Sequence, residues 1–148
     1  MRFIIQRVKK ASVEVENKLV GKIEQGFLVL IGITQEDNEQ TADKLIKKLI
    51  NLRVFTDEND KMNLSLKDSK GEMLLVSQFT LYADCKKGNR PSFDKSAKFD
   101  VANQLYEYII AECKKTGINI ETGIFGAKMQ VSLVNDGPVT IILDSDEI

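Results

Sequence analysis

The sequence predicts an α+β layered sandwich, with antiparallel-rich β-sheets and two long flanking helices. Three observations lead to this prediction. About seven segments have the alternation or apolar content of strands, two longer segments have helical periodicity, and the helices interrupt runs of strands instead of following each strand. Residues 1–148 contain no repeat, low-complexity tract or linker, so we expect one domain.

The first part of the chain is rich in strand patterns. Residues 3–8 are mostly apolar, and residues 12–16 alternate with a period of two. Asn17-Lys18 is a turn signal that leads into a strand at 19–23. Residues 27–33 are almost all apolar, which predicts a strand that is buried on both faces.

Two segments have the periodicity of amphipathic helices. Asp37 or Asn38 can cap the first helix. Its apolar stripe consists of Ala42, Leu45, Ile46, Leu49 and Ile50. The second helix is predicted over residues 96–115, and Gly117 ends it. Its inner face is predicted to carry Phe99, Ala102, Leu105, Tyr106, Ile109, Ile110 and Cys113.

The remaining segments complete the layered arrangement. Residues 57–61 form a polar loop, and residues 73–81 form a second buried strand whose polar residues come only near its end. Residues 84–98 are a lysine-rich loop. The last predicted strands are 118–122, 129–134 and 139–143.

The composition excludes several classes of active site. The chain has no histidine, and its only cysteines are Cys85 and Cys113. The absence of histidine excludes Ser-His-Asp and Cys-His machinery and a histidine-ligated zinc site. Two cysteines cannot make an all-cysteine zinc site, and they give no disulfide framework. We therefore expect no metal and no cofactor, and chemistry that uses hydroxyls, carboxylates, lysines or backbone groups.

The charge balance bears on partners and location. The chain has 21 basic and 22 acidic residues, for a net charge of -1. This balance argues against tight nucleic-acid binding driven by charge alone, but a small basic face that touches RNA is compatible with it. Residues 1–7 become polar too early for a signal peptide, and no apolar run approaches the ~18 residues of a membrane span. The expected location is cytoplasmic, with no membrane partner.

A Gly-Pro pair, Gly137-Pro138, separates the last two predicted strands. Proline fixes φ and has no backbone N–H, X–Pro bonds take the cis form at low cost, and glycine lets a backbone or ligand approach closely. The pair therefore predicts a rigid edge with bare carbonyl oxygens, suited to recognising shape with the main chain. The structural alternative is a hairpin turn, because Asp136-Gly137 is a common turn pair and proline suits turn edges.

The segment Ser77–Leu81 closes a predicted buried strand, and ligands commonly bind at strand ends in α/β architectures. In the functional interpretation, the backbone N–H groups of Gln78 and Phe79 form an oxyanion hole, and the Phe79 ring is a packing surface for a base. Thr80 is a candidate nucleophile, although no activating base accompanies it. In the structural alternative, the hydroxyl groups of this segment only satisfy neighbouring backbone groups.

Two basic features can be explained without a functional role. Arg7 fits a surface ion pair with a glutamate, which is the usual role of an arginine. Residues 86–90, Lys-Lys-Gly-Asn-Arg, fit a solvated loop, with phosphate contact as the alternative. The carboxylates of Asp57, Asp60 and Asp68 lack the spacing of a calcium loop.

Several short motifs are informative through their order, although each alone is weak. They are Gln6-Arg7-Val8, Ala11-Ser12-Val13, Lys61-Met62-Asn63-Leu64, Ser77-Gln78-Phe79-Thr80-Leu81, Arg90-Pro91-Ser92-Phe93, Gly123-Ile124-Phe125-Gly126-Ala127, Met129-Gln130-Val131 and Asn135-Asp136-Gly137-Pro138-Val139-Thr140. The ordered set spans Met1 to about Leu143. It resembles the D-aminoacyl-tRNA deacylase family of the bacterial type, the D-tyrosyl-tRNA(Tyr) deacylases.

This resemblance implies a deacylase-type fold and a homodimer with its active sites at the subunit interface. Gly137-Pro138, a cis pair in the family, would reach from one subunit into the pocket of the other. Its carbonyls would flank the α-carbon of the substrate and leave no space for an L side chain. Arg7 would brace this loop. The resemblance thus implies chiral proofreading of the aminoacyl-tRNA 3′ end during translation quality control.

The resemblance also assigns the residues of the pocket. Ser77, Gln78, Phe79 and Thr80 would hold the terminal adenosine and the ester carbonyl. Phe125 and Met129 match positions of the pocket wall.

The implied reaction agrees with the absence of histidine. An aminoacyl ester is already activated, so positioning and oxyanion stabilisation can suffice, and one oxyanion donor is typically worth ~10²–10³ in rate. In the family, the 2′-hydroxyl of the terminal ribose of the tRNA assists the water. Because glycine is achiral, main-chain exclusion cannot reject it, so glycine mischarged on alanine tRNA is a second expected substrate.

Two other functions stay open at this stage. One is an esterase in which Thr80 forms an acyl-enzyme intermediate. The other is a non-catalytic RNA-binding module that keeps the fold without turnover, although the lack of a dominant basic run is unfavourable for such a module.

Overall fold

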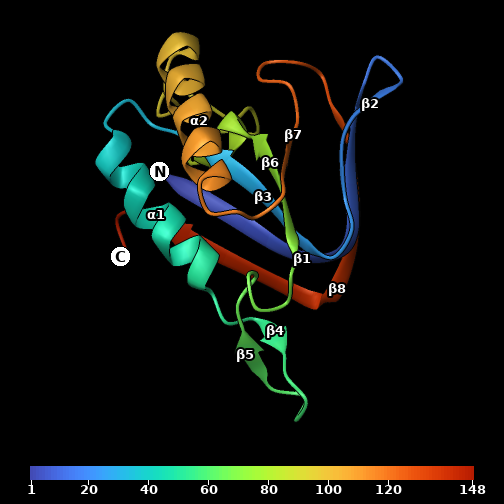
Figure 1. Cartoon of the computed structure of the whole chain (residues 1–148). Coiled ribbons are helices and arrows are strands. Elements are labelled where there is room, and N and C mark those ends of the chain that lie inside the picture. The colour runs from blue at the N-terminus through green and yellow to red at the C-terminus, as the bar shows by residue number, and fades with distance from the viewer.

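The computed structural model describes all residues, 1–148. It has eight strands, two α-helices (α1 and α2) and one short 3-10 helix, η1 (Figure 1). The bounds are β1 Arg2–Val15, β2 Lys18–Ile23, β3 Gly26–Gly32, α1 Glu39–Asn51, β4 Phe55–Thr56, β5 Met62–Leu64, β6 Glu72–Ser77, η1 Phe79–Tyr82, α2 Phe99–Lys114, β7 Ile120–Thr122 and β8 Gln130–Asp144.

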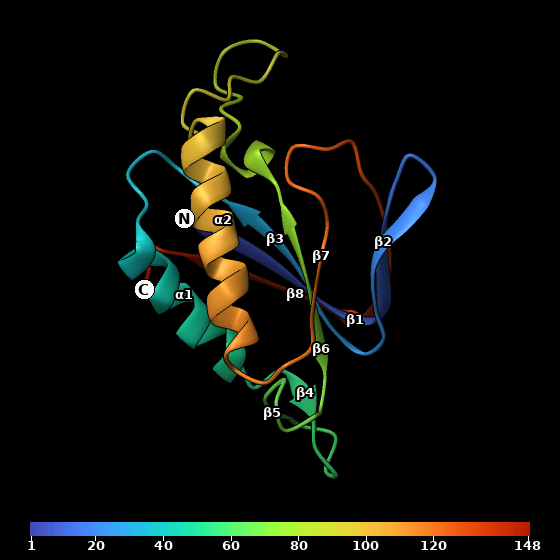
Figure 2. The same cartoon turned by 45° about the horizontal axis from the view of Figure 1, so that its top comes forward.

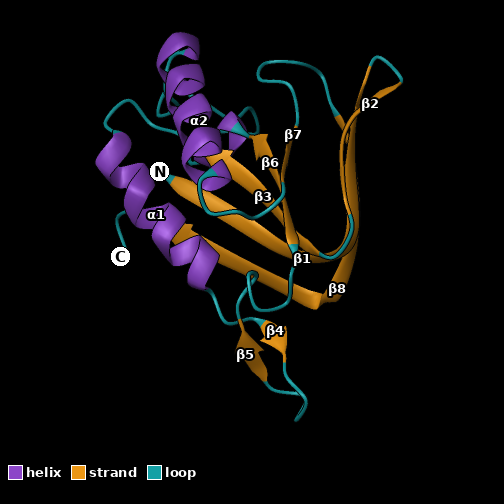
Figure 3. Ribbon diagram, viewed as in Figure 1, coloured by secondary structure: helices purple, strands orange, loops and turns teal.

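One six-stranded sheet organises the molecule. Its order is β2-β1-β3-β6-β7, and β8 pairs with β1, while β4 and β5 form a separate hairpin. Strand β1 is antiparallel to β2, β3 and β8, whereas β3, β6 and β7 run parallel to one another. Both helices pack against one face of the sheet (Figure 3). The predicted α+β class with two flanking helices is confirmed.

Strand β3 lies between two hydrophobic cores, as its apolar sequence predicts. Because side chains alternate along a strand, Phe27, Val29 and Ile31 face the helices. Leu28 faces a second, smaller core that also contains Val13 of β1. The second core exists because the outer half of β1 and strand β2 curl over the sheet, as the second view shows (Figure 2).

The structure corrects several predicted strand boundaries. The predicted strands 3–8 and 12–16 merge into one strand, β1, which ends at Val15, and the predicted strands 129–134 and 139–143 merge into β8, which begins at Gln130. The hairpin interpretation of Gly137-Pro138 is therefore wrong, because both halves of β8 pair with β1. The predicted strand 73–81 ends at Ser77, where the chain turns into η1.

The helix signals are largely confirmed. Asn38 caps α1, and its side chain accepts a hydrogen bond of 3.0 Å from the Thr41 N–H. Asp37 instead binds the Met1 amino group at 2.6 Å. Helix α2 begins at residue 99, not 96, and Gly117 follows it with φ +80°. No helix is long and apolar enough to cross a membrane.

Candidate functional site

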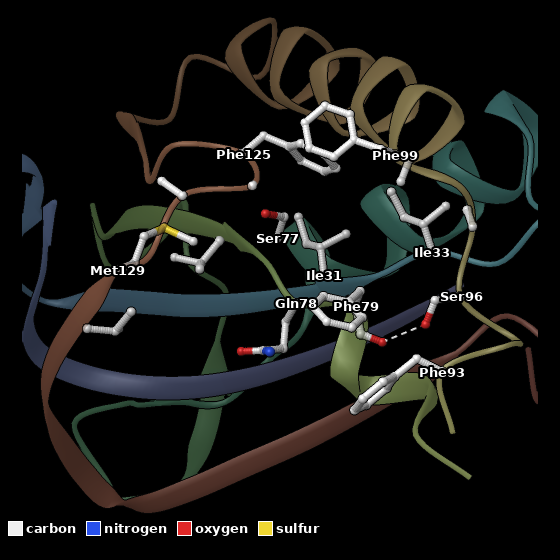
Figure 4. Close-up of a pocket in the computed structure, with 16 residues that line it drawn as sticks. Ile31, Ile33, Ser77, Gln78, Phe79, Phe93, Ser96, Phe99, Phe125 and Met129 are labelled. Carbon is white, nitrogen blue, oxygen red and sulfur yellow. Dashed lines mark hydrogen bonds between the residues drawn. The ribbon is translucent and has the colours of Figure 1, made fainter. Parts of the chain in front are cut away.

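A cavity of about 630 Å³ opens where strands β3 and β6 end. We call it the β3–β6 cavity. Helix α2 and the segment before β8 cover one side, and η1 and the following loop form the other (Figure 4). Its volume is in the usual range for small-molecule sites, and its wall is mostly apolar. The lining residues are Ile31, Ile33, Val76, Ser77, Gln78, Phe79, Phe93, Ser96, Ala97, Phe99, Ala102, Phe125, Gly126, Ala127, Met129 and Val131.

The end of β6 brings the first predicted site residues to this cavity. Ser77, Gln78 and Phe79 all line it. The Gln78 N–H is not a free oxyanion donor, however, because it donates to the Ile31 carbonyl at 2.7 Å and so continues the β3–β6 ladder. Phe79 is the first residue of η1, and the first N–H groups of a helix have no partner within the helix. The oxyanion interpretation therefore centres on the Phe79 N–H.

Thr80 lies on η1 and does not line the β3–β6 cavity. Its hydroxyl accepts a hydrogen bond from the Gln78 side-chain amide. An amide nitrogen cannot take up a proton as a general base does. Thr80 therefore lacks the activating partner that a hydroxyl nucleophile requires.

The rim of the cavity includes two residues, Phe93 and Ser96, to which the sequence motifs assigned no role. The ring of Phe93 packs edge-on against that of Phe79, with centroids 5.0 Å apart. Ser96 donates its hydroxyl to the Phe79 carbonyl at 2.9 Å (Figure 4). Phe79 itself remains 58% exposed, so its ring is available as a packing surface. The Arg90-Pro91-Ser92-Phe93 motif, which contains Phe93, is the feature of the sequence that points to this rim.

The opposite wall contains Phe125 and Met129, as the family resemblance implies. The Phe125 ring packs edge-on against Phe99, with centroids 4.9 Å apart. The prediction that Phe99 belongs to the buried face of α2 is wrong, since this side chain is 62% exposed at the start of the helix. Gly126 lets the wall approach closely, because a Cβ there would lie 2.6 Å from the Phe99 ring.

Neither cysteine is placed to act in the cavity. Burial raises the pKa of the Cys113 thiol to about 12, so it stays protonated at neutral pH. Cys85 is exposed and does not line the cavity.

Gly137 and Pro138 lie on a bulge in β8. Gln6 pairs with Thr140 and Val8 with Asn135, so residues 136–139 together stand opposite a single residue of β1. We call residues 136–139 the β8 bulge. The Gly137-Pro138 bond is cis, and Gly137 has φ +129°, a region that favours glycine. Both residues are exposed.

Arg7 is the residue of β1 that faces the β8 bulge. Its Nε donates to the Asp136 carbonyl at 3.0 Å and lies 3.5 Å from the Asp136 carboxylate. A second guanidinium N–H donates to the Val54 carbonyl. The arginine is only 8% exposed, so the alternative of a surface pair with glutamate is wrong. The contact agrees with the bracing position implied by the resemblance.

The predicted site residues therefore fall into two regions of one chain. Ser77, Gln78, Phe79, Phe125 and Met129 meet at the β3–β6 cavity, while Arg7, Gly137 and Pro138 meet at the β8 bulge. No residue of the bulge lines the cavity.

Comparison with known proteins shows the family of the chain. The D-Tyr-tRNA(Tyr) deacylase family matches residues 4–144. A D-aminoacyl-tRNA deacylase of Thermosipho africanus is 60% identical over 100% of this chain and 99% of its own length. One from Pseudoalteromonas translucida is 59% identical over 97% of this chain and 99% of its own.

Two solved structures share the fold. The c-Myc DNA Unwinding Element Binding Protein is 40% identical, with a TM-score of 0.91 over 97% of this chain and 98% of the other. A probable eukaryotic D-amino acid tRNA deacylase is 18% identical, with a TM-score of 0.83 over 96% and 97%. This second likeness concerns the fold alone.

The fold and the family match define a hydrolase of carboxylic esters. The chain belongs to the D-Tyr-tRNA(Tyr) deacylase family, and the family and enzyme class that the motifs predict are confirmed.

Proposed function

We propose that this protein hydrolyses the ester bond of D-aminoacyl-tRNA in the β3–β6 cavity, and that the β8 bulge of a second subunit completes the site. One observation carries the proposal. The two sets of predicted site residues form a concave apolar cavity and an exposed rigid bulge, and the bulge does not line the cavity of its own chain. A homodimer with active sites at the interface brings the two together.

The lining of the cavity supports the 3′ end of tRNA as its occupant. The exposed Phe79 ring, supported by Phe93, offers a face on which the terminal adenine can stack. The apolar wall with Phe125 and Met129 offers contact with the rest of the aminoacyl-adenosine group. Few polar groups are needed in such a site, provided that they fix the ester carbonyl.

The reaction needs no nucleophilic side chain. Water adds to the ester carbonyl, the negative charge on its oxygen is stabilised by the Phe79 N–H, and the bond to the ribose oxygen then breaks. The leaving oxygen takes the proton that the attacking water gives up, and the 2′-hydroxyl of the ribose assists this transfer. The products are a free D-amino acid and tRNA. Positioning and one oxyanion donor are sufficient contributions for an ester that is already activated.

We assign the selection of D over L substrates to the Gly137-Pro138 main chain. Its carbonyls accept hydrogen bonds from the substrate ammonium group, which fixes the α-carbon and directs an L side chain into the backbone. This exclusion does not depend on the identity of the L side chain, because the wall is main chain. Glycine has no side chain to exclude, so glycine mischarged on alanine tRNA is also a proposed substrate. A cytoplasmic location follows from this proposed role in translation.

The decisive test is incubation with D-Tyr-tRNA and L-Tyr-tRNA side by side, with light scattering on the same active sample. We expect release of D-tyrosine only, from a dimer. Equal release from both substrates would contradict chiral selection, and an active monomer would contradict the shared site. Binding of tRNA without any release would favour the non-catalytic RNA-binding module.

A further inference from the structure

The loop that follows η1 differs in charge from the rest of the chain. We call residues 84–98 the basic loop. It carries five basic side chains and two acidic ones, a formal charge of +3 in a chain whose total is -1. The basic residues are Lys86, Lys87, Arg90, Lys95 and Lys98. A positive segment in an acidic chain is an electrostatic footprint for a polyanion.

The basic residues at the tip of the loop are not neutralised within the chain. Lys95 lies 3.8 Å from the Asp84 carboxylate, but Lys86, Lys87 and Arg90 form no ion pair. All three are exposed. Their charges are therefore available to a partner.

The base of the loop is fastened to the rim of the β3–β6 cavity. Asp84 and Ser92 exchange backbone hydrogen bonds of 2.7 and 2.9 Å, which close the loop. The contacts of Phe93 and Ser96 with Phe79, described above, join this base to η1. The tip extends away from the body of the protein beside the start of α2 (Figure 2). The free charges are thus held next to the cavity and outside it.

The tip of the β4–β5 hairpin has the opposite charge to the basic loop. Residues 57–61, at the tip of the β4–β5 hairpin, carry three acidic side chains and one lysine. In Figure 2 this hairpin and the basic loop lie at the two extremes of the molecule. The two tips therefore differ in the attraction that they offer to a polyanion.

We propose that the basic loop binds phosphates of the tRNA acceptor end whose terminal adenosine occupies the β3–β6 cavity. This inference rests on the proposed function. RNA is the favoured partner because the loop that carries the free cations also holds Phe93 against the exposed Phe79 ring at its base, and single-stranded nucleic acid is bound by such a combination of stacking and backbone charge. The loop supplies affinity for the body of the substrate, and the cavity supplies the chemistry.

The test compares a loop variant with a charge-matched control. The loop variant is Lys86→Ala/Lys87→Ala/Arg90→Ala, and the control is Lys44→Ala/Lys47→Ala/Lys48→Ala, which removes three exposed charges from α1. Each is assayed on D-Tyr-tRNA and on 3′-O-D-tyrosyl-adenosine, which has no phosphate. Binding of uncharged tRNA is measured by fluorescence anisotropy over a range of salt concentrations.

We expect the loop variant to have a KM for D-Tyr-tRNA raised about 10-fold or more at moderate salt, because three phosphate contacts are lost. The slope of log affinity against log salt is expected to become shallower by about 2. The rate on the adenosine ester and both rates of the control variant are expected to match the wild type.

Other outcomes overturn the inference. Unchanged tRNA binding and an unchanged salt slope would exclude phosphate contact and favour an acidic protein as the partner of the loop. An equal loss on the adenosine ester would show that the loop only shapes the cavity. If the wild type hydrolyses neither ester, the proposed function fails, while the anisotropy measurement still decides whether the loop binds RNA.

Discussion

The β3–β6 cavity and the β8 bulge are built in opposite ways. The cavity is concave and is lined mainly by apolar side chains, and one of its backbone donors, the Gln78 N–H, is engaged within its own chain. At the bulge, Gly137 and Pro138 are exposed, and the buried Arg7 beneath them holds the Asp136 carbonyl.

Neither region is a complete site by itself. The cavity offers shape and a stacking surface, but walls made of side chains also discriminate among different substrate side chains. The bulge offers a rigid main-chain edge but no enclosure. Each region supplies what the other lacks, and the predictions below test whether they act together.

The largest effect is expected for Gly137→Ala. A Cβ at Gly137 would lie 2.9 Å from the Val139 side chain and 3.2 Å from the Arg7 guanidinium, and the φ of +129° is unfavourable for alanine. Displacement of the edge by about 1 Å is expected to reduce D-Tyr-tRNA turnover about 100-fold. Gly117→Ala is the matched control, since Gly117 also has positive φ but a Cβ there meets nothing within 4 Å. Equal activities of the two variants would show that the β8 bulge has no role in the reaction.

A mixing experiment tests whether the two regions act across subunits. Ala102→Phe is designed to fill the cavity while leaving the bulge intact, and Gly137→Ala does the reverse. Each variant alone is expected to retain about 1% of wild-type activity or less. After unfolding and refolding together, half of the dimers are mixed and each has one intact site, so about one quarter of wild-type activity is expected. If the mixture stays inactive although mixed dimers form, as mass spectrometry can verify, the shared site is contradicted.

A smaller effect is expected for Arg7→Lys. Lysine keeps the charge but cannot donate from a planar group to both Asp136 and Val54. We expect turnover of D-Tyr-tRNA to fall about 10-fold, because the bulge is loosened rather than displaced. Arg7→Ala is expected to cost about 1.5–3 kcal/mol of stability as well, because buried acceptors lose a charged donor. Denaturant unfolding separates the two effects. A Lys variant with wild-type kinetics would show that Arg7 serves stability alone.

The smallest effect is expected for Thr80→Ala. This hydroxyl lies outside the cavity and has only an amide beside it. Turnover within about threefold of the wild type is expected, since a residue that forms no acyl intermediate contributes no chemical step. Mass spectrometry during turnover provides the check. An acyl adduct on Thr80, or loss of activity in a folded variant, would establish the acyl-enzyme alternative.

Local sequence was sufficient for the elements that one stretch of chain specifies. The apolar run of β3 predicted burial on both faces, and Asn38 was among the predicted caps of α1. Local sequence was not sufficient to predict the strand boundaries where a strand contains an irregular pairing. Lys9 and Lys10 are exposed within β1 and resemble a loop, yet both neighbouring segments continue one ladder. Strand continuity depends on the partner strand, which lies far away in the sequence.

The same limit applies to the site. The sequence by itself determined the family, the enzyme class and the residues that carry the motifs, because these depend on residue identity and order. Only the tertiary structure decided that the Gln78 N–H is engaged, that Arg7 is buried against the bulge and that Phe99 is exposed. It also decided that the cavity and the bulge of one chain are separate. Hydrogen-bond partners and burial are set by segments that meet only on folding, and no local pattern encodes them.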